Sequence, residues 1–396
     1  MAPFLLIFIY LVIAFLGAWL TDLCLRRWKM PDFAARIRRW WLIPYVLLSL
    51  VPVAGAFLPD SPVKFALHAA GNVWLGFYLY YGFLLLVLVG IMELVRLASG
   101  GRAARRWHGG ILCLSLVVAL AVTGYGLVHA QDTVVVNYDL ELDKPADGVD
   151  EMKVILLGDL HLSVNSRLAT TQRMVELINA EEPDLVVIAG DIFTSSYTGL
   201  SQPERYAEAL RGIKSKYGVY AVYGNHDVEE TLFGGFPISP ISQAFRTSQM
   251  EAFFDDCGFI TLADQVVTLP GGVQLAGRID GEKAGDGTAN RMTPAELLAG
   301  VDRSRPVLVL EHEPKQFQAL KEAGADLALC GHTHAGQMFP GNLIVPFFNE
   351  NAWGYKRLHE LDTFVTAGVG YYGPPMRVGT DSEITVINMT FKGKDA

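Results

Sequence analysis

Residues 153–161 read KVILLGDLH, a short apolar run that ends in Gly158, Asp159 and His161. A run of this length bounded by glycine is typical of a buried β-strand that stops at a loop. Asp159 and His161 are two residues apart, so on an extended segment their side chains leave the same face and can reach one cation. Taken alone, this pair is weak evidence for a metal site.

The same pattern of an apolar run followed by polar residues recurs along the chain. The runs 185–189, 219–223, 307–310 and 327–330 end in Gly190-Asp191, in Gly224-Asn225-His226-Asp227, at His312 and in Gly331-His332-Thr333-His334. Residues 167–182 have helical spacing, and 133–142, 363–369 and 383–391 read as further strands. Strands that alternate with helices predict a layered α/β core with its functional residues beyond the strand ends.

Histidine placement predicts a metal centre at these strand ends. Of nine histidines, five follow the apolar runs, namely His161, His226, His312, His332 and His334. Asp159 and Asp191 add carboxylates, Asp191 in a position to bridge two metals, and Asn225 adds an amide oxygen. Imidazole and carboxylate together suit zinc, iron and similar ions. His68, His108, His129 and His359 fall in apolar segments, their flanks or a loop, where a structural role is expected.

The first third of the chain predicts a membrane region. Hydrophobic residues make up 51% of the sequence, and four nearly charge-free segments cover residues 4–25, 42–58, 70–97 and 111–130. Each could cross a hydrocarbon core of about 30 Å. Buried helices of a soluble core are the alternative, but the segments lack amphipathic periodicity. A cleaved signal peptide would need a basic start that the first segment lacks. We therefore expect a transmembrane region at 1–130 and a second domain at 131–396.

Basic residues suggest an orientation for these segments. They gather between the first and second segments (Arg26, Arg27, Lys29, Arg36, Arg38, Arg39) and between the third and fourth (Arg96, Arg102, Arg105, Arg106). Only Lys64 lies between the second and third. The positive-inside rule then puts both termini outside, which makes the second domain extracytoplasmic in a bacterial-type cell membrane. One miscounted helix would reverse this orientation.

Cysteine usage and net charge exclude some classes of protein. The four cysteines form no CxxC pair, so small buried side chains are expected rather than a zinc or disulfide framework. A net charge of −9 gives no basic footprint for nucleic acid. The arginine clusters beside apolar segments indicate anionic membrane lipid as a neighbour. The sequence does not set the oligomeric state.

The ordered set GDLH, GD, GNHD, a lone histidine and GHTH resembles the calcineurin-like metallophosphoesterases over about residues 150–392. GHTHAGQ and the segment 368–386 are similar to the membrane-associated YkuE/YaeI-type branch. That branch includes enzymes that cleave UDP-2,3-diacylglucosamine, a lipid A precursor. Gly158 replaces the usual serine and Ala335 a usual glycine, and neither is a ligand. The four apolar segments lie outside the resemblance.

The resemblance implies a four-layer αββα sandwich of two mixed sheets. It assigns one divalent metal, Mn, Fe or Zn, to Asp159, His161, Asp191 and His334, and a second to Asp191, Asn225, His312 and His332. Such a pair would activate a hydroxide for attack on phosphorus. His226 would stabilise the transition state or protonate the leaving oxygen, with Asp227 orienting it. Arg377 is expected to bind a substrate phosphate or carboxylate.

Two groups of neighbouring residues carry weaker expectations. Glu311 and Glu313 flank His312 and are expected to be solvated loop acids, with a supporting role behind the metal ligands as the alternative. Residues 234–240 and 281–287 read as surface loops that would set substrate specificity.

Three hypotheses for function follow. The leading one is a membrane-anchored phosphoesterase that hydrolyses a phosphodiester or pyrophosphate bond of a lipid-linked or nucleotide-linked substrate. The first alternative is a non-catalytic receptor or scaffold that keeps the metal-bound fold, which would be expected to lose a ligand or His226. A transporter is the other alternative, but the apolar segments show no buried charge pairs or broken-helix pattern.

Overall fold

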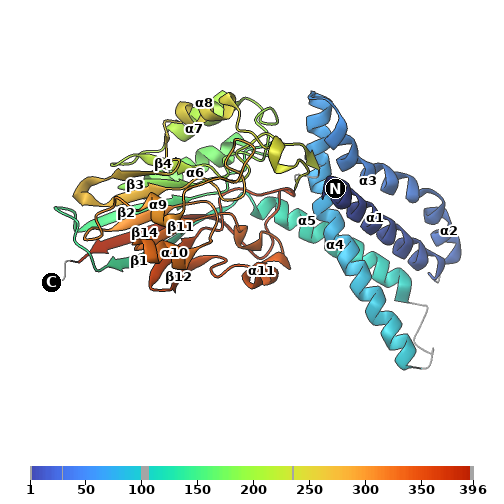
Figure 1. The fold of residues 1–396 in the computed structure, drawn as a ribbon. Helices are drawn as coiled ribbons and strands as arrows, with labels where there is room; N and C mark the ends of the chain where they lie inside the picture. The colour runs from blue at the N-terminus through green and yellow to red at the C-terminus, as the bar shows by residue number, and fades with distance from the viewer. Residues whose placement is uncertain (1, 29, 100–106, 234–235, 393–396) are drawn as a thin grey trace. The chain divides into compact units, whose positions relative to one another are not determined.

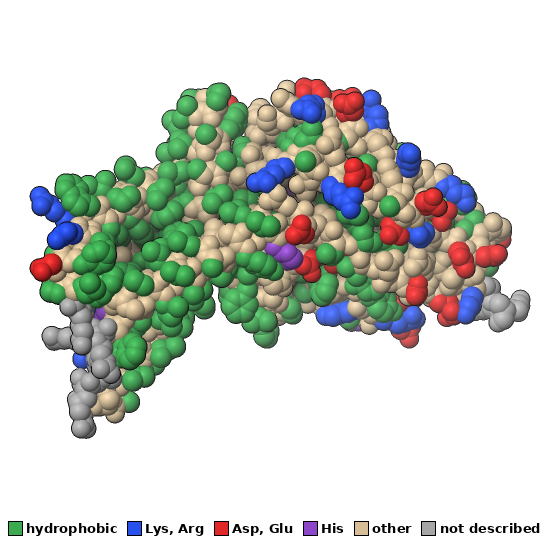
Figure 2. Space-filling view, turned by 180° about the vertical axis from the view of Figure 1, so that it is seen from behind, with side chains coloured by type: hydrophobic (Ala, Val, Ile, Leu, Met, Phe, Trp, Pro, Cys, Tyr) green, Lys and Arg blue, Asp and Glu red, His purple; other side chains and the backbone are tan. Residues whose placement is uncertain are grey.

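The computed structural model describes residues 2–28, 30–99, 107–233 and 236–392 (Figure 1). The chain divides into two compact units. The helical unit comprises Met1–Val128 with Thr231–Ile238 and Gly373–Met376; the sheet unit comprises His129–Glu230, Ser239–Tyr372 and Arg377–Ala396. In Figure 2 hydrophobic side chains cover much of the helical unit, whereas acidic and basic side chains are spread over the sheet unit.

The helical unit contains five helices in its described residues: α1 (Ala2–Arg26), α2 (Pro31–Trp40), α3 (Leu42–Phe57), α4 (Pro62–Ala98) and α5 (His108–His129). Four stretches are long and apolar enough to cross a membrane, Leu6–Arg26, Pro31–Phe57, Pro62–Ala98 and His108–His129, which confirms the four predicted spans. The short helix α2 was not predicted, because its Arg36, Arg38 and Arg39 read as a basic loop. Arg102, Arg105 and Arg106 lie outside the described residues.

Polar contacts join the helices of this unit. Arg27 Nη1 lies 2.8 Å from Glu93 Oε1 and links α1 to α4. The hydroxyl of Tyr45 in α3 donates to the carbonyl of Ala14 in α1 at 2.9 Å. Such hydrogen bonds between helices satisfy polar groups where water is scarce.

The stretch predicted as a surface loop at 234–240 is partly built into the helical unit. Residues 234 and 235 lie outside the described residues. Phe236–Pro237 (β6) pairs antiparallel with Leu232–Phe233 (β5). The Phe233 ring packs edge-on against Tyr10 of α1, with 5.2 Å between ring centroids. In the described part of this stretch, Phe236 and Pro237 form a short strand and Ile238 is buried, whereas Pro240 is exposed. The prediction of a surface loop therefore holds only in part.

Two six-stranded mixed sheets form the sheet unit. The first has the order β1-β14-β2-β3-β4-β7, and the second has the order β12-β13-β11-β10-β9-β8. Their bounds are β1 Thr133–Leu142, β2 Glu151–Leu157, β3 Leu185–Ala189, β4 Val219–Val222, β7 Ile260–Thr261, β14 Ser382–Phe391; β8 Gln265–Thr268, β9 Gln274–Gly277, β10 Val307–Leu310, β11 Leu327–Cys330, β12 Gly354–Leu358 and β13 Leu361–Val365. β2, β3 and β4 are parallel, as are β9, β10, β11 and β13. Residues that follow neighbouring parallel strands therefore meet at one edge of each sheet.

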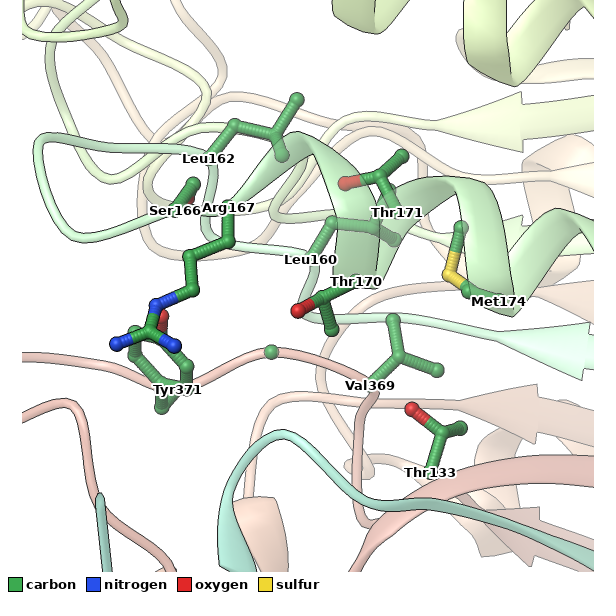
Figure 3. Close-up of a pocket in the computed structure, with 11 residues that line it drawn as sticks. Thr133, Leu160, Leu162, Ser166, Arg167, Thr170, Thr171, Met174, Val369 and Tyr371 are labelled. Carbon is green, nitrogen blue, oxygen red and sulfur yellow. The ribbon is translucent and has the colours of Figure 1, made fainter. Parts of the chain in front are cut away.

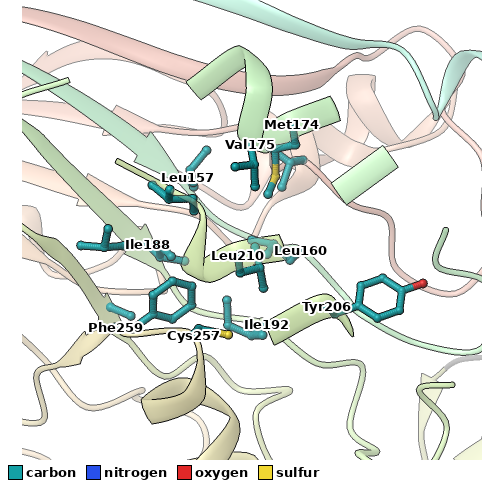
Figure 4. Close-up of a cluster of buried hydrophobic side chains, with 14 of the residues drawn as sticks. Leu157, Leu160, Met174, Val175, Ile188, Ile192, Tyr206, Leu210, Cys257 and Phe259 are labelled. Carbon is teal, nitrogen blue, oxygen red and sulfur yellow. The ribbon is translucent and has the colours of Figure 1, made fainter. Parts of the chain in front are cut away.

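Side-chain alternation along the strands creates the layers. In β2, Val154 and Leu156 face Leu308 and Leu329 of the second sheet in a core between the sheets. Residues of opposite parity, such as Leu157, pack against the helices α6 (Leu168–Ala180), α7 (Pro203–Arg211) and α8 (Ser248–Asp256), as Figure 4 shows. The helices α9 (Pro294–Leu297) and α10 (Phe317–Ala323) cover the outer face of the second sheet. This is the predicted αββα sandwich.

Candidate metal centre

The first group of predicted ligands gathers at the ends of β2, β3 and β11. Asp159, His161 and His334 each offer one ligand atom, and these atoms lie within 4.8 Å of one another. The Nε2 atoms of His161 and His334 are 2.9 Å apart. His161 Nε2 is also 3.5 Å from Asp191 Oδ2. All four side chains are buried, so the structure brings together the set predicted for one cation.

The second group gathers at the ends of β4, β10 and β11. His312 Nε2 lies 3.1 Å from Asp191 Oδ2 and 3.0 Å from Asn225 Oδ1. His332 Nδ1 lies 3.2 Å from His312 Nε2 and 3.3 Å from Asn225 Oδ1. Asp191 thus contacts both groups through the same oxygen, as expected of a bridging carboxylate.

Hydrogen bonds behind the ligands fix the orientation of two imidazoles. His312 Nδ1 lies 2.6 Å from the carbonyl of Ala189 and therefore donates to it. This donation turns Nε2 toward Asp191 and Asn225, where it would bind a cation once its own proton is displaced. His161 Nδ1 pairs with Thr194 Oγ1 at 3.2 Å and likewise turns Nε2 inward. Such outer contacts raise ligand basicity and hold the ring in place.

The ligand loops have a strained backbone. Asp159, His161, Asp191, His332 and His334 all have φ between 47° and 76°, a left-handed conformation that costs a residue with a side chain about 1–2 kcal/mol. Strain of this kind concentrates at functional sites, where the surrounding fold enforces it. The loops are also closely packed. At position 224 only glycine fits, because a Cβ there would collide with Asp191 Oδ1. The sequence pattern did not reveal this conformation.

The metal-free site has an unusual distribution of charge. Burial raises the pKa of Asp159 to about 7. Burial alone would also raise the pKa of Asp191, but the adjacent His312 and His226 hold that pKa well below its usual range. Burial would lower the pKa of His312, yet the Asp191 carboxylate raises it well above its usual value. The pKa of His161 and that of His332 fall to about 4 because both rings are buried.

His226 lies beside both groups and is held by a hydrogen-bonded relay. Its Nδ1 is 2.9 Å from Ser195 Oγ, which donates to Glu230 Oε2 at 3.2 Å. Because the serine proton goes to the carboxylate, Nδ1–H of His226 donates to the serine and Nε2 stays free. Lys283 Nζ binds Glu230 at 2.6 Å. The ring of Tyr372 packs on His226, with 4.5 Å between centroids.

The expected role of Asp227 in orienting His226 is not met. The Asp227 carboxylate instead accepts hydrogen bonds from the backbone N–H groups of Asp191, Phe193 and Gly224 at 2.9–3.0 Å. It therefore fixes the loop that presents Asp191. Ser195 instead contacts His226, and Glu230 holds Ser195 in place. Neither follows a predicted strand directly, so the strand-end pattern did not single them out.

Arg377 is fully buried and binds backbone oxygens. Its guanidinium donates to the carbonyls of His334, Ala367, Gly368 and Gly370 at 2.7–3.1 Å. Burial lowers its pKa to about 10, and nearby Asp159 offsets part of this shift. Arg377 thus joins the His334 loop to the loop after β13. Substrate binding by Arg377 stays a prediction.

Glu311 and Glu313 are buried, so the expectation of solvated loop acids is wrong. Arg278 Nη1 donates to Glu311 Oε2 at 2.6 Å and neutralises it. Glu313 pairs with Lys315 at 2.5 Å, and with Glu282 and His332 it forms a further group of clustered ligand atoms. Both acids support the strand end that carries His312. The 281–287 loop supplies two of these contacts: Glu282 belongs to the group with Glu313, and Lys283 binds Glu230.

Figure 3 shows a small cavity at the start of α6, with a volume of about 40 Å³. It is lined by Leu160 and Leu162, which flank His161, and by Arg167, Val369 and Tyr371 among others. This volume holds one or two water molecules. It is too small for an organic substrate.

The residues fit a pair of divalent cations. Imidazole nitrogens and carboxylate oxygens converge in two buried groups that share Asp191. The Nε2 atoms of His161 and His334 face each other at a distance that needs a proton or a cation between them. His334 Nδ1 is buried without a hydrogen-bond partner in the described structure. Such mixed N and O donors accept Mn, Fe or Zn.

This fold and this donor set are those of the metallophosphoesterase class, and comparison with known proteins agrees. Residues 152–336 match the family model described as calcineurin-like phosphoesterase. A zebrafish (Danio rerio) transmembrane protein with metallophosphoesterase domain is 31% identical over 376 residues, covering 88% of this chain and 80% of the relative. The chain belongs to the calcineurin-like phosphoesterase family.

Two bacterial relatives are similar over smaller shares of the chain. An uncharacterized metallophosphoesterase of Helicobacter pylori is 32% identical over 291 residues, 71% of each chain. Bacillus subtilis YkuE, also named as an uncharacterized metallophosphoesterase, is 26% identical over 61% of this chain and 80% of its own. The zebrafish match is longer than the sheet unit, so similarity extends into the helical unit, which the sequence resemblance had left out.

Proposed function

We propose that the chain is a binuclear-metal hydrolase that cleaves a phosphodiester or pyrophosphate bond. One observation carries the proposal: the predicted donor set is complete and converges in two groups that share Asp191, with His226 beside them. A non-catalytic relative would be expected to lack one of these residues. Two cations in this place would supply an activated water and neutralise the charge that develops on the phosphoryl oxygens.

The chain's own residues supply a fixed geometry and a proton-transfer group, His226, which must take up a proton at Nε2 before it can pass one to the leaving oxygen. Nδ1–H of His226 donates to Ser195, which in turn donates to Glu230, so Nε2 is the nitrogen left for proton transfer. Burial lowers the pKa of His226 well below its usual value. The ring is therefore neutral at rest, and the carboxylate of Glu230 would stabilise it when it becomes charged during the reaction. Tyr372 restricts its rotation.

The test is hydrolysis of bis-p-nitrophenyl phosphate by the full-length protein in detergent, after removal of metal and addition of Mn²⁺. We expect His226→Ala to lower kcat by about 10²–10⁴-fold while the protein still binds metal. His359→Ala changes an exposed histidine and should leave kcat unchanged. Equal activity of wild type and His226→Ala, or activity without any metal, would reject the proposal.

The substrate class follows from the membrane spans. A phosphoester carried by a lipid would be concentrated next to an enzyme anchored in the same bilayer. A lipid-linked phosphoester fits this setting. A cytoplasmic nucleotide lipid such as UDP-2,3-diacylglucosamine would fit only if the sheet unit faced the cytoplasm, so substrate and orientation are coupled. A receptor that binds the same headgroup without turnover is the competing function, and the assay above separates the two.

We further propose that the sheet unit lies outside the cytoplasm. The support is the cluster of basic residues at the end of α1 and in the short helix α2, namely Arg26, Arg27, Arg36, Arg38 and Arg39, which lie where the first two apolar stretches meet. Fusion of alkaline phosphatase to the C-terminus should give an active reporter in a bacterial host, whereas a fused green fluorescent protein should stay dark. If the green fluorescent protein fusion were fluorescent and the alkaline phosphatase fusion inactive, the sheet unit would lie in the cytoplasm and the proposal would be wrong.

A further inference from the structure

The segment that follows the GHTHAGQ loop exposes a cluster of large apolar side chains. The apolar patch consists of Phe339, Leu343, Ile344, Phe347, Phe348 and Trp353, all exposed. Phe347 and Phe348 are 86% and 81% exposed, more than any other exposed large hydrophobic side chain in the described residues, those of the apolar helices included. Large aromatic rings left in water forgo the stabilisation that burial would give them. A patch of this kind indicates a binding surface.

Hydrogen bonds hold this segment firmly in the sheet unit. Phe339 N donates to the carbonyl of Val378 at 2.8 Å, and Thr380 Oγ1 donates to the carbonyl of Gln337 at 2.6 Å. The segment includes the short helix α11 (Gly341–Ile344), whose Asn342 donates to the carbonyl of Gly379 at 3.3 Å. Polar groups thus bind inward while the apolar rings point outward. The exposure is a property of the fold rather than of a loose end.

Residues 381 and 382, which follow this segment's partners Gly379 and Thr380, contact the C-terminal end of α5. Asp381 Oδ1 lies 2.9 Å from Nε2 of His129, the last residue of α5. Ser382 Oγ donates to the carbonyl of Ala130 at 3.1 Å. Asp381 lines a cavity of about 330 Å³ together with Asn342 and Pro346. α5 is long and apolar enough to span a membrane, so these contacts tie the segment that carries the patch to the end of a candidate span.

We propose that the apolar patch inserts into the surface layer of the membrane that α5 crosses. Trp353 supports a lipid occupant, because its indole N–H is bound to Glu383 at 2.7 Å while half of the residue is exposed. Tryptophan with a bound polar edge and a free ring is typical of the boundary between headgroups and hydrocarbon. Lys356 is exposed next to the patch and suits lipid phosphates.

Insertion of the patch would place the metal centre at the membrane surface. Gln337, two residues before Phe339, binds the backbone of Tyr372 through both ends of its amide at 2.7 and 2.9 Å. Tyr372 packs on His226. If the proposed hydrolysis is correct, the patch brings His226 to the headgroup level, where lipid phosphoesters lie.

The test places a fluorescent probe on the patch of the full-length protein in lipid vesicles. Cys113 is replaced by serine, and the other native cysteines are buried. Probes are attached to Phe347→Cys, to Phe348→Cys and, as control, to Ile260→Cys on the edge strand β7, where Ile260 is 45% exposed. Quenching is measured with doxyl-labelled lipids and with aqueous iodide.

At Phe347→Cys and Phe348→Cys, we expect lipid-borne doxyl groups to quench about twofold or more strongly than at Ile260→Cys, with iodide showing the reverse order. Three similar quenching profiles would overturn the proposal. Probe-to-probe contact between copies, without quenching by lipid, would assign the patch to a second copy and also overturn it. The measurement needs no turnover, so its outcome is independent of the hydrolase assay.

Discussion

The Nε2 atoms of His161 and His334 face each other at 2.9 Å, although 173 residues separate them in the chain. Neither histidine can move away, because His161 is bound through Nδ1 to Thr194 and both rings are buried. Two lone pairs at this distance are stable only with a proton or a cation between them. The fold therefore prepares a cation site before any cation binds.

Metal affinity should rise with pH. Asp159 has a pKa of about 7 in the metal-free protein and His312 a pKa well above its usual value, so at pH 6 both hold protons that a cation must displace. Raising the pH through 7 removes the Asp159 proton and strengthens binding. Calorimetric titration with Mn²⁺ in two buffers of different ionisation enthalpy should show proton release at pH 6 and less at pH 8. Release that does not change with pH would contradict these shifts.

Glu230→Gln should slow turnover without loss of metal. The substitution keeps the shape of the side chain but removes the charge that supports His226 through Ser195, so we expect kcat to fall about tenfold. The pH profile of kcat should shift as well, because His226 loses a stabilising carboxylate. Glu208→Gln on the exposed face of α7 is the matched control. Lost metal in Glu230→Gln would point to a merely structural role.

Arg377→Gln should destabilise the sheet unit. It leaves carbonyls of the His334 and Gly368 loops without their donor, and a change of this kind costs about 3 kcal/mol or more. Arg173→Gln, at an exposed ion pair, should change stability by less than about 0.5 kcal/mol. Thermal unfolding of both full-length variants is the measurement. An unchanged Tm in Arg377→Gln, with a raised KM, would favour the substrate contact predicted from the sequence.

Ala335→Gly should stabilise the protein. Ala335 has φ 51° and ψ 21°, which glycine adopts without the steric cost that alanine bears. After the greater flexibility of glycine in the unfolded chain is subtracted, a gain of up to about 1 kcal/mol remains. The same exchange at Ala207, inside α7, should cost about 1 kcal/mol. We expect Tm to rise in Ala335→Gly and to fall in Ala207→Gly. A shift in the same direction in both variants would contradict the conclusion that the backbone of Ala335 is strained.

Much of the fold followed from the sequence because strand ends and ligands coincide. The apolar runs before Asp159, Asp191 and Asn225 became the neighbouring parallel strands β2, β3 and β4 of the first sheet, and those before His312 and His332 became β10 and β11 of the second. The exits of strands in one sheet therefore had to meet, whereas the meeting of the two sets depends on how the sheets pack. Short edge strands such as β8 were not predicted, since four residues with little burial carry a weak pattern.

The contacts of His226 could not be predicted in the same way. Ser195 and Glu230 lie on different loops and meet only in the folded chain, and a loop serine or glutamate has no distinctive spacing. Glu311 looked like a solvated acid because its partner Arg278 is 33 residues away. The apolar patch was also missed, because 339–353 contains the same residue types as a buried segment and only the fold shows which way they point.

The most direct test of the binuclear site is a titration of the metal-free full-length protein with Mn²⁺, in which bound metal and hydrolysis of bis-p-nitrophenyl phosphate are followed together. We predict two ions per chain, turnover that appears as the second ion binds, and loss of both tight binding and turnover in Asp191→Asn. Full turnover with one ion or none, or a folded protein with two ions bound and no hydrolysis of this or any lipid phosphoester, would contradict a two-metal hydrolase.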